Sequence, residues 1–193
     1  MTMAAVRFLG GLVTVLLLTY AGWAIVHRPP HTDTSAPTLA GEQFPAVNRD
    51  ALTPLQNRVL DVTRQQFEAQ PPPTTFTDGQ DKPWSADFVC WVLRQAGAPV
   101  AGVADGSWRI PTVYDLEQYY QSVGRLEGPG YRPHPGDVML WGVRSPLALH
   151  ANIVVSAAGD TVITVGGDER GIGLRHTQLR PDLGLLGYGR LTR

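Results

Sequence analysis

Residues 83–97 read Pro-Trp-Ser-Ala-Asp-Phe-Val-Cys-Trp-Val-Leu-Arg-Gln-Ala-Gly. Apolar residues recur in this stretch at the spacing of one helix face: Phe88, Val89, Val92 and Ala96. Gly97 follows, and glycine is the residue type that most often ends a helix. The stretch therefore predicts a helix over residues 85–96, with one buried face and the hydroxyl of Ser85 at its N-terminus.

Two further helices are predicted, one on each side of this stretch. The first begins at Thr53-Pro54-Leu55-Gln56, where Thr is the N-cap, Pro is the first helical residue and Gln closes a capping box. Pro71-Pro72-Pro73 ends it. The other follows Pro111, with Thr112 and Asp115 as a cap-like pair.

After Gly124 the helical period disappears, and short runs typical of strands follow. They cover residues 137–141, 151–156, 161–165, 172–175 and 185–191. Gly159-Asp160 is predicted as a hairpin turn, and Gly166-Gly167 ends the third run. Helices followed by an antiparallel meander predict an α+β domain over residues 52–193.

Composition excludes several classes of protein. The chain has 193 residues, 16 basic and 17 acidic side chains and one cysteine. A single Cys cannot form an intrachain disulfide, a CxxC redox site or a cysteine-based zinc cluster. The balanced charge removes the electrostatic basis for nucleic-acid binding. His134 and His176 lack metal-binding spacing, so neither a metal nor another cofactor is predicted.

The N-terminus predicts a membrane-directed segment within residues 1–28. Residues 8–26 carry no charged side chain, and 19 residues of helix span about 28 Å, close to the thickness of a bilayer core. An uncleaved anchor and a cleaved signal peptide both remain open, and both place the domain outside the cytoplasm. Residues 29–51 are rich in proline and are predicted to be a linker.

Three more motifs follow along the chain, of which the last two carry side chains that suit catalysis. They are Pro135-Gly136-Asp137-Val138, His150-Ala151-Asn152-Ile153-Val154 and Gly166-Gly167-Asp168-Glu169. If the last two lie on paired antiparallel strands, the ends that carry the histidine and the carboxylates meet. The hydroxyl of Ser85 joins them if the N-terminus of its helix packs against that edge.

The four motifs, in this order, resemble those of papain-like peptidoglycan hydrolases of the NlpC/P60 and CHAP type. The resemblance covers residues 53–191. It implies a papain-like fold and a Cys–His–polar triad that cleaves amide bonds in cell-wall peptides, on a protein exported to the bacterial envelope. Peptidoglycan or its peptides are then the expected partner, together with a membrane contacted by the N-terminal segment.

The chain departs from the family pattern at the nucleophile, because Ser85 stands where the family has cysteine. A thiol at a helix N-terminus can ionise beside a histidine, whereas a serine hydroxyl needs a general base to remove its proton. A related group of the same superfamily also has a Trp-Ser-Ala-x-Phe run. Ser85 is therefore either a nucleophile or simply the N-cap of its helix.

The other members of the predicted site are His150 as general base and Asp168 as the residue that orients it. Glu169 is the substitute for Asp168, and a solvated acid in a turn is the alternative. His150 in turn has the alternative of a hydrogen-bonded histidine at a strand end. Gln80 is a candidate donor to an oxyanion, and Asn152 is expected to be a polar group on the sheet surface.

Cys90 is not predicted to replace Ser85 as the nucleophile. Five residues along a helix correspond to a rotation of about 140°, so its thiol faces away from the site and is expected to be buried. Two functions follow. One is a cell-wall amidase or peptidase that uses Ser85, His150 and Asp168, and the other is a non-catalytic wall-binding or scaffold module with the same fold.

Overall fold

The structure of the protein is a computed structural model, and it describes residues 42–180 and 184–191. The chain divides into two units, Met1–Asp33 and Thr34–Arg193, and every described residue belongs to the second. The expected membrane segment within residues 1–28 lies outside the described residues. Within the described ranges, none of the helices has the length and apolar character needed to cross a bilayer.

The helices form where the sequence predicts them, with one addition. They are α2 (Pro54–Ala69), α3 (Thr74–Thr77), α4 (Ser85–Gln95) and α5 (Val113–Ser122). The capping box of α2 is present, with the Thr53 side chain accepting from the Gln56 backbone and the Gln56 side chain accepting from the Thr53 backbone. Thr112 caps α5 in a similar way through Asp115. The short helix α3 was not predicted.

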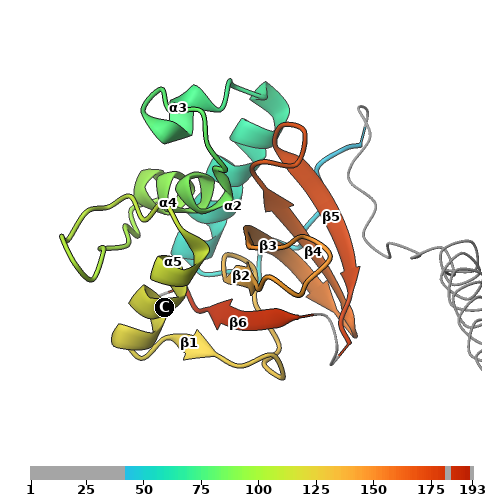
Figure 1. The fold of residues 1–193 in the computed structure, drawn as a ribbon. Helices are drawn as coiled ribbons and strands as arrows, with labels where there is room; N and C mark the ends of the chain where they lie inside the picture. The colour runs from blue at the N-terminus through green and yellow to red at the C-terminus, as the bar shows by residue number, and fades with distance from the viewer. Residues whose placement is uncertain (1–41, 181–183, 192–193) are drawn as a thin grey trace, which may run out of the picture. The chain divides into compact units, whose positions relative to one another are not determined.

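One antiparallel sheet of six strands forms the other half of the domain (Figure 1). Its strands are β1 (Leu126–Glu127), β2 (Val138–Trp141), β3 (His150–Ala158), β4 (Thr161–Gly166), β5 (Gly173–Gln178) and β6 (Leu185–Gly189). The fold is thus α+β, with helices packed on an antiparallel sheet.

The strand order corrects the expectation of a simple meander. The sheet runs β1-β6-β2-β3-β4-β5, so β2 to β5 form a meander but β6 returns to pair with β2. The β3–β4 turn is the predicted two-residue loop, since Ala158 pairs with Thr161 and Gly159 has a φ of +59°.

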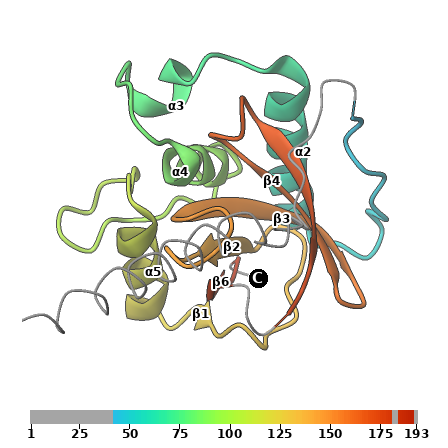
Figure 2. The same cartoon turned by 45° about the vertical axis from the view of Figure 1, so that its right-hand side comes forward.

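Apolar side chains cover both faces of the central strands. One core cluster joins α2, α4 and α5 to alternate strand residues such as Leu140 and Ile153. A second cluster on the remaining residues of these strands contains Met139, Trp141 and Val154. In Figure 2, α4 lies across β3, and this contact places the N-terminus of α4 near the start of β3.

The domain begins before the predicted boundary at residue 52. Phe44 and Val47, which were expected in the linker, pack against the first core cluster, and the rings of Phe44 and Phe67 lie 5.9 Å apart. Arg49 forms an ion pair with Asp61 of α2. Residues 44–49 therefore belong to the folded domain.

Candidate functional site

Ser85 is the first residue of α4, and its side chain is turned toward the sheet. The residue is 5% exposed, and its Oγ accepts a hydrogen bond from the backbone N–H of Ala151 at 3.3 Å. The N-cap position belongs to Trp84, and no side chain caps this helix. The alternative in which the Ser85 hydroxyl acts as the N-cap is therefore wrong.

His150 begins β3, and its ring is held by a carboxylate. Its Nε2 lies 3.0 Å from Oε1 of Glu169, in the loop between β4 and β5. Asp168 is exposed, and no hydrogen bond joins it to His150 within the described chain. The acid that faces His150 is thus Glu169, the substitute considered above, and not Asp168.

Glu169 lies at the centre of a buried polar network. Asn152 donates from Nδ2 to the same Oε1 at 2.7 Å. Arg175 on β5 donates to Oε2 from Nε at 3.2 Å and from Nη2 at 2.9 Å. Asn152 is fully buried, and its Oδ1 accepts from Nε1 of Trp141 at 2.9 Å, so the expectation that it lies on the sheet surface is wrong.

This network determines the protonation of its members. Burial by itself would raise the pKa of Glu169, but the hydrogen bond with His150 and the charge of Arg175 outweigh it, so the pKa lies below its ordinary value. An ionised carboxylate only accepts hydrogen bonds, so Nε2 of His150 must carry a proton. In neutral His150 this leaves Nδ1 with the lone pair that a general base needs.

Glycines make room for the network. A Cβ at Gly173 would lie 2.8 Å from Cβ of Glu169, and a Cβ at Gly166 would collide with the Asn152 amide. A Cβ at Gly167 would collide with the ring of Trp84. The Gly166-Gly167 pair, which the sequence suggests only as the end of a strand, thus permits the close approach of the β4–β5 loop to the start of α4.

Ser85 also lines a cavity of about 670 Å³. The remaining lining residues are mostly apolar, and two of them, Val143 and Leu149, are large apolar residues exposed to solvent at 62% and 37%. Gln80 lines the same cavity. Exposed apolar side chains around a concave surface are typical of ligand-binding sites.

The first turn of α4 presents free donors at this cavity. The first backbone bond of the helix is donated by Phe88 to Trp84, and in the described structure the N–H groups of residues 85–87 have no protein acceptor. Ser85 and Ala86 line the cavity. Unpaired N–H groups at a helix N-terminus favour a negative charge beside them, which is the property that an oxyanion hole needs.

A buried ion pair fixes the segment that precedes α4. Asp87 is fully buried, and its Oδ2 lies 2.8 Å from Nζ of Lys82, which lines the cavity. Arg109 approaches the other oxygen of Asp87 at 3.6 Å and pairs with Asp78. Lys82 is therefore held in the cavity wall, close in sequence to both Gln80 and Ser85.

Ser85 and His150, two of the predicted site residues, are linked through the backbone at the start of β3. Ala151, which donates to Ser85, directly follows His150 in β3. Among the described residues, however, no hydrogen bond joins the Ser85 hydroxyl to either ring nitrogen of His150. His150 pairs across the strands with Trp141, on the sheet face of the second core cluster, whereas Ala151 belongs to the cluster that packs against α4. Neither His150 nor Glu169 lines the cavity beside Ser85. Proton transfer from Ser85 to His150 therefore requires the two side chains to come within hydrogen-bond distance.

The other side chains singled out in the sequence lie elsewhere. Cys90 is buried, as expected, and burial raises the pKa of its thiol to about 12. His134 contacts Tyr131 at 2.9 Å beside a separate cavity of about 750 Å³. Tyr119 and Tyr120 of α5 are buried in the core.

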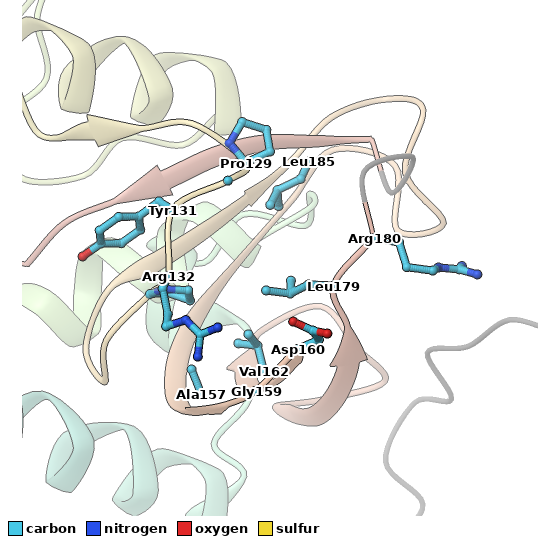
Figure 3. A pocket seen from close by; sticks show the side chains of 12 residues that line it. Pro129, Tyr131, Arg132, Ala157, Gly159, Asp160, Val162, Leu179, Arg180 and Leu185 are labelled. Atoms are coloured by element: carbon cyan, nitrogen blue, oxygen red, sulfur yellow. The ribbon is translucent and has the colours of Figure 1, made fainter.

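A third cavity, of about 370 Å³, is lined by the 129–133 segment, the β3–β4 hairpin and the chain around Leu179 and Leu185 (Figure 3). Arg132 and Asp160 are exposed at its edge, and none of the predicted site residues lines it.

Comparison of the chain with protein-family models, curated proteins and solved structures found no match. The family resemblance therefore depends on the four sequence motifs.

Proposed function

We propose that this protein is an exported, papain-like cell-wall amidase or peptidase that cleaves amide bonds in peptidoglycan. Ser85 is the nucleophile and His150 the general base, and Glu169 takes the orienting role predicted for Asp168. The observation that carries the proposal is the 3.0 Å hydrogen bond between His150 and Glu169, in a strand whose next residue bonds to the Ser85 hydroxyl.

The chemistry follows from the protonation of the network. Nδ1 of His150 accepts the hydroxyl proton while Oγ of Ser85 forms a bond to the amide carbonyl carbon. The N–H groups of Ser85 and Ala86 stabilise the negative charge on the carbonyl oxygen. His150 then gives the proton to the leaving amine, and a water molecule, activated by the same ring, hydrolyses the acyl-enzyme.

The character of the cavity beside Ser85 favours a peptide substrate with small apolar side chains. Its walls are mostly apolar, and Lys82 is the only charged residue among the described residues that line it. Residues 8–26, as an anchor or a signal, would deliver the domain to the envelope, where such peptides occur. The membrane contact and the extracytoplasmic location belong to the same proposal.

Digestion of purified peptidoglycan by the full chain tests this function. We expect the wild type to release soluble fragments and Ser85→Ala to release none. Glu169→Gln should reduce the rate by about 100-fold or more, because the imidazole loses its anionic partner. Asp168→Asn is the matched control and should behave like the wild type, since Asp168 is exposed. Equal release by the wild type and Ser85→Ala would contradict the proposal.

A second function has its own support. The Ser85 hydroxyl accepts from Ala151 and, within the described chain, does not bond to His150, as expected for a non-catalytic wall-binding or scaffold module. Co-sedimentation with peptidoglycan, without release of fragments, would favour this function. If only Ser85→Cys is active, the wild-type site is intact except that it lacks a thiol nucleophile. A cysteine at a helix N-terminus can ionise to a thiolate and so depends less on a general base than a serine does.

A further inference from the structure

We infer that Arg175 is a positioning residue of this site, which keeps Glu169 ionised and thereby fixes the ring nitrogen of His150 that carries the proton. The inference extends the proposed function, in which His150 acts through Nδ1. It adds a fourth member to the site, from a strand in which neither the family resemblance nor the sequence pattern places a functional residue.

The two oxygens of Glu169 have separate partners. Arg175 donates twice to Oε2, whereas His150 and Asn152 share Oε1. Because Arg175 occupies Oε2, the carboxylate is held with Oε1 toward the imidazole. Arg175 therefore sets the orientation of the carboxylate as well as its charge.

Because Glu169 is buried, it needs the positive charge of Arg175 to stay ionised. Arg175 is 5% exposed and Glu169 is 7% exposed, so water screens the pair only weakly. A carboxylate buried without a cation would take up a proton at the expense of its acceptor role. A protonated Glu169 has a donor of its own, and Nε2 of His150 would no longer be required to carry the hydrogen.

Within residues 42–180 and 184–191, no side chain other than Arg175 brings a permanent positive charge into hydrogen-bond contact with Glu169. The groups that contact Glu169 from β3 are His150 and the neutral amide of Asn152, and the group from β5 is Arg175. The next residue along β5, His176, is 55% exposed at its side chain and pairs with Glu42. Loss of Arg175 would thus remove the permanent positive charge at this carboxylate.

The tautomer of His150 is the direct readout. Long-range ¹H–¹⁵N NMR spectra of the full chain, labelled with ¹⁵N-histidine, distinguish Nε2–H from Nδ1–H, and His150→Gln assigns the signals by their loss. We expect one tautomer, Nε2–H, in the wild type and in Arg175→Lys, which keeps the charge. Arg175→Met should give a mixture of tautomers. An unchanged Nε2–H tautomer in Arg175→Met would overturn the inference.

Kinetics supply a second readout. On a soluble peptidoglycan peptide, Arg175→Met should lower kcat by about 10- to 100-fold with little change in KM, as partners of oriented histidines do elsewhere, and Arg175→Lys should restore much of the rate. Equal loss in both variants would count against a role through charge. If Arg175→Met does not fold, Glu169→Gln replaces it, and retention of pure Nε2–H there would overturn the inference.

The two proposals can fail separately. If the wild type shows the Nε2–H tautomer, and Arg175→Met loses it, but no variant cleaves peptidoglycan, then Arg175 positions His150 in a site that does not catalyse this reaction. If peptidoglycan is cleaved but the tautomer does not depend on Arg175, the proposed function stands and the inference about Arg175 fails.

Discussion

The backbone N–H of Ala151 donates to the hydroxyl oxygen of Ser85 across 3.3 Å, and this bond joins the start of α4 to the start of β3. The acceptor is thereby directed toward the strand, while the hydrogen of the hydroxyl remains available to another partner. The bond makes Ser85 a structural contact as well as a candidate nucleophile, so activity and stability must be measured separately for every variant at this position.

Ser85→Ala should be less stable than the wild type by about 1–3 kcal/mol, because the buried N–H of Ala151 loses its acceptor. Urea denaturation at neutral pH, followed by circular dichroism, gives the free energy of unfolding. A change below about 0.5 kcal/mol would show that the bond contributes little.

Thiol labelling distinguishes the two cysteine positions. In the wild type, Cys90 should not react with Ellman's reagent until the protein is unfolded, since its side chain is buried and burial raises its pKa to about 12. Ser85→Cys should add one thiol that reacts in the folded state, because position 85 lines a cavity at a helix N-terminus. Labelling of the folded wild type would contradict the burial of Cys90.

Substitution of Glu169 should lower the stability of the domain much more than substitution of its neighbour Asp168. Glu169→Gln breaks a buried ion pair with Arg175 and should cost about 3–5 kcal/mol. Asp168→Asn changes an exposed side chain with a φ of +66°, a conformation that asparagine tolerates, and should cost less than about 0.5 kcal/mol. Thermal unfolding of both variants beside the wild type checks the difference, and similar losses would contradict the assignment of Glu169.

The stabilisation by Glu169 should depend on pH. Its pKa in the folded protein lies below the ordinary value of 4.5, so the stabilisation is fully present above pH 4.5 and is lost as the pH falls through the folded pKa. The difference in unfolding free energy between the wild type and Glu169→Gln should therefore be constant near neutral pH and shrink in acid. Urea titrations across the acid range measure it, and a constant difference would contradict the lowered pKa.

Gly167→Ala should destabilise the domain by about 1–3 kcal/mol or more, because the new methyl group would collide with the ring of Trp84 and lie 2.9 Å from Cβ of Phe88. Gly128→Ala is the matched control, since nothing lies within 4 Å of its added Cβ, and its effect should stay below about 1 kcal/mol. The same urea titration serves both variants. An equal effect of the two substitutions would contradict the close approach at Gly167.

Local signals in the sequence predict most of the fold. Helix starts are marked by the capping box at Thr53 and the cap at Thr112, because these side chains accept hydrogen bonds from N–H groups of the first turn. A helix end is marked by the glycine after Ala96. The turn at Gly159-Asp160 is equally local. The return of β6 to β2 depends on contacts between distant segments, and no nearby residue signals it.

The site was predicted less completely for the same reason. Ser85 and His150 each open a regular element and are easily located. The choice between Asp168 and Glu169 depends on left-handed backbone at Asp168 and Arg170, with φ of +66° and +63°, which turns one acid outward and its neighbour inward. In the sequence, Arg175 looks like any polar residue of a strand, and only the folded structure shows that it contacts Glu169.

The pairing of β2 with the last strand also affects how the protein is made. β2 lies between β6 and β3, so one side of its backbone has no partner until residues 185–189 have been synthesised. Pairing across so long a loop is slow compared with helix formation. The sheet that carries His150 can therefore be completed only after residues 185–189 have been synthesised, so nascent chains that stop before these residues should lack the finished sheet.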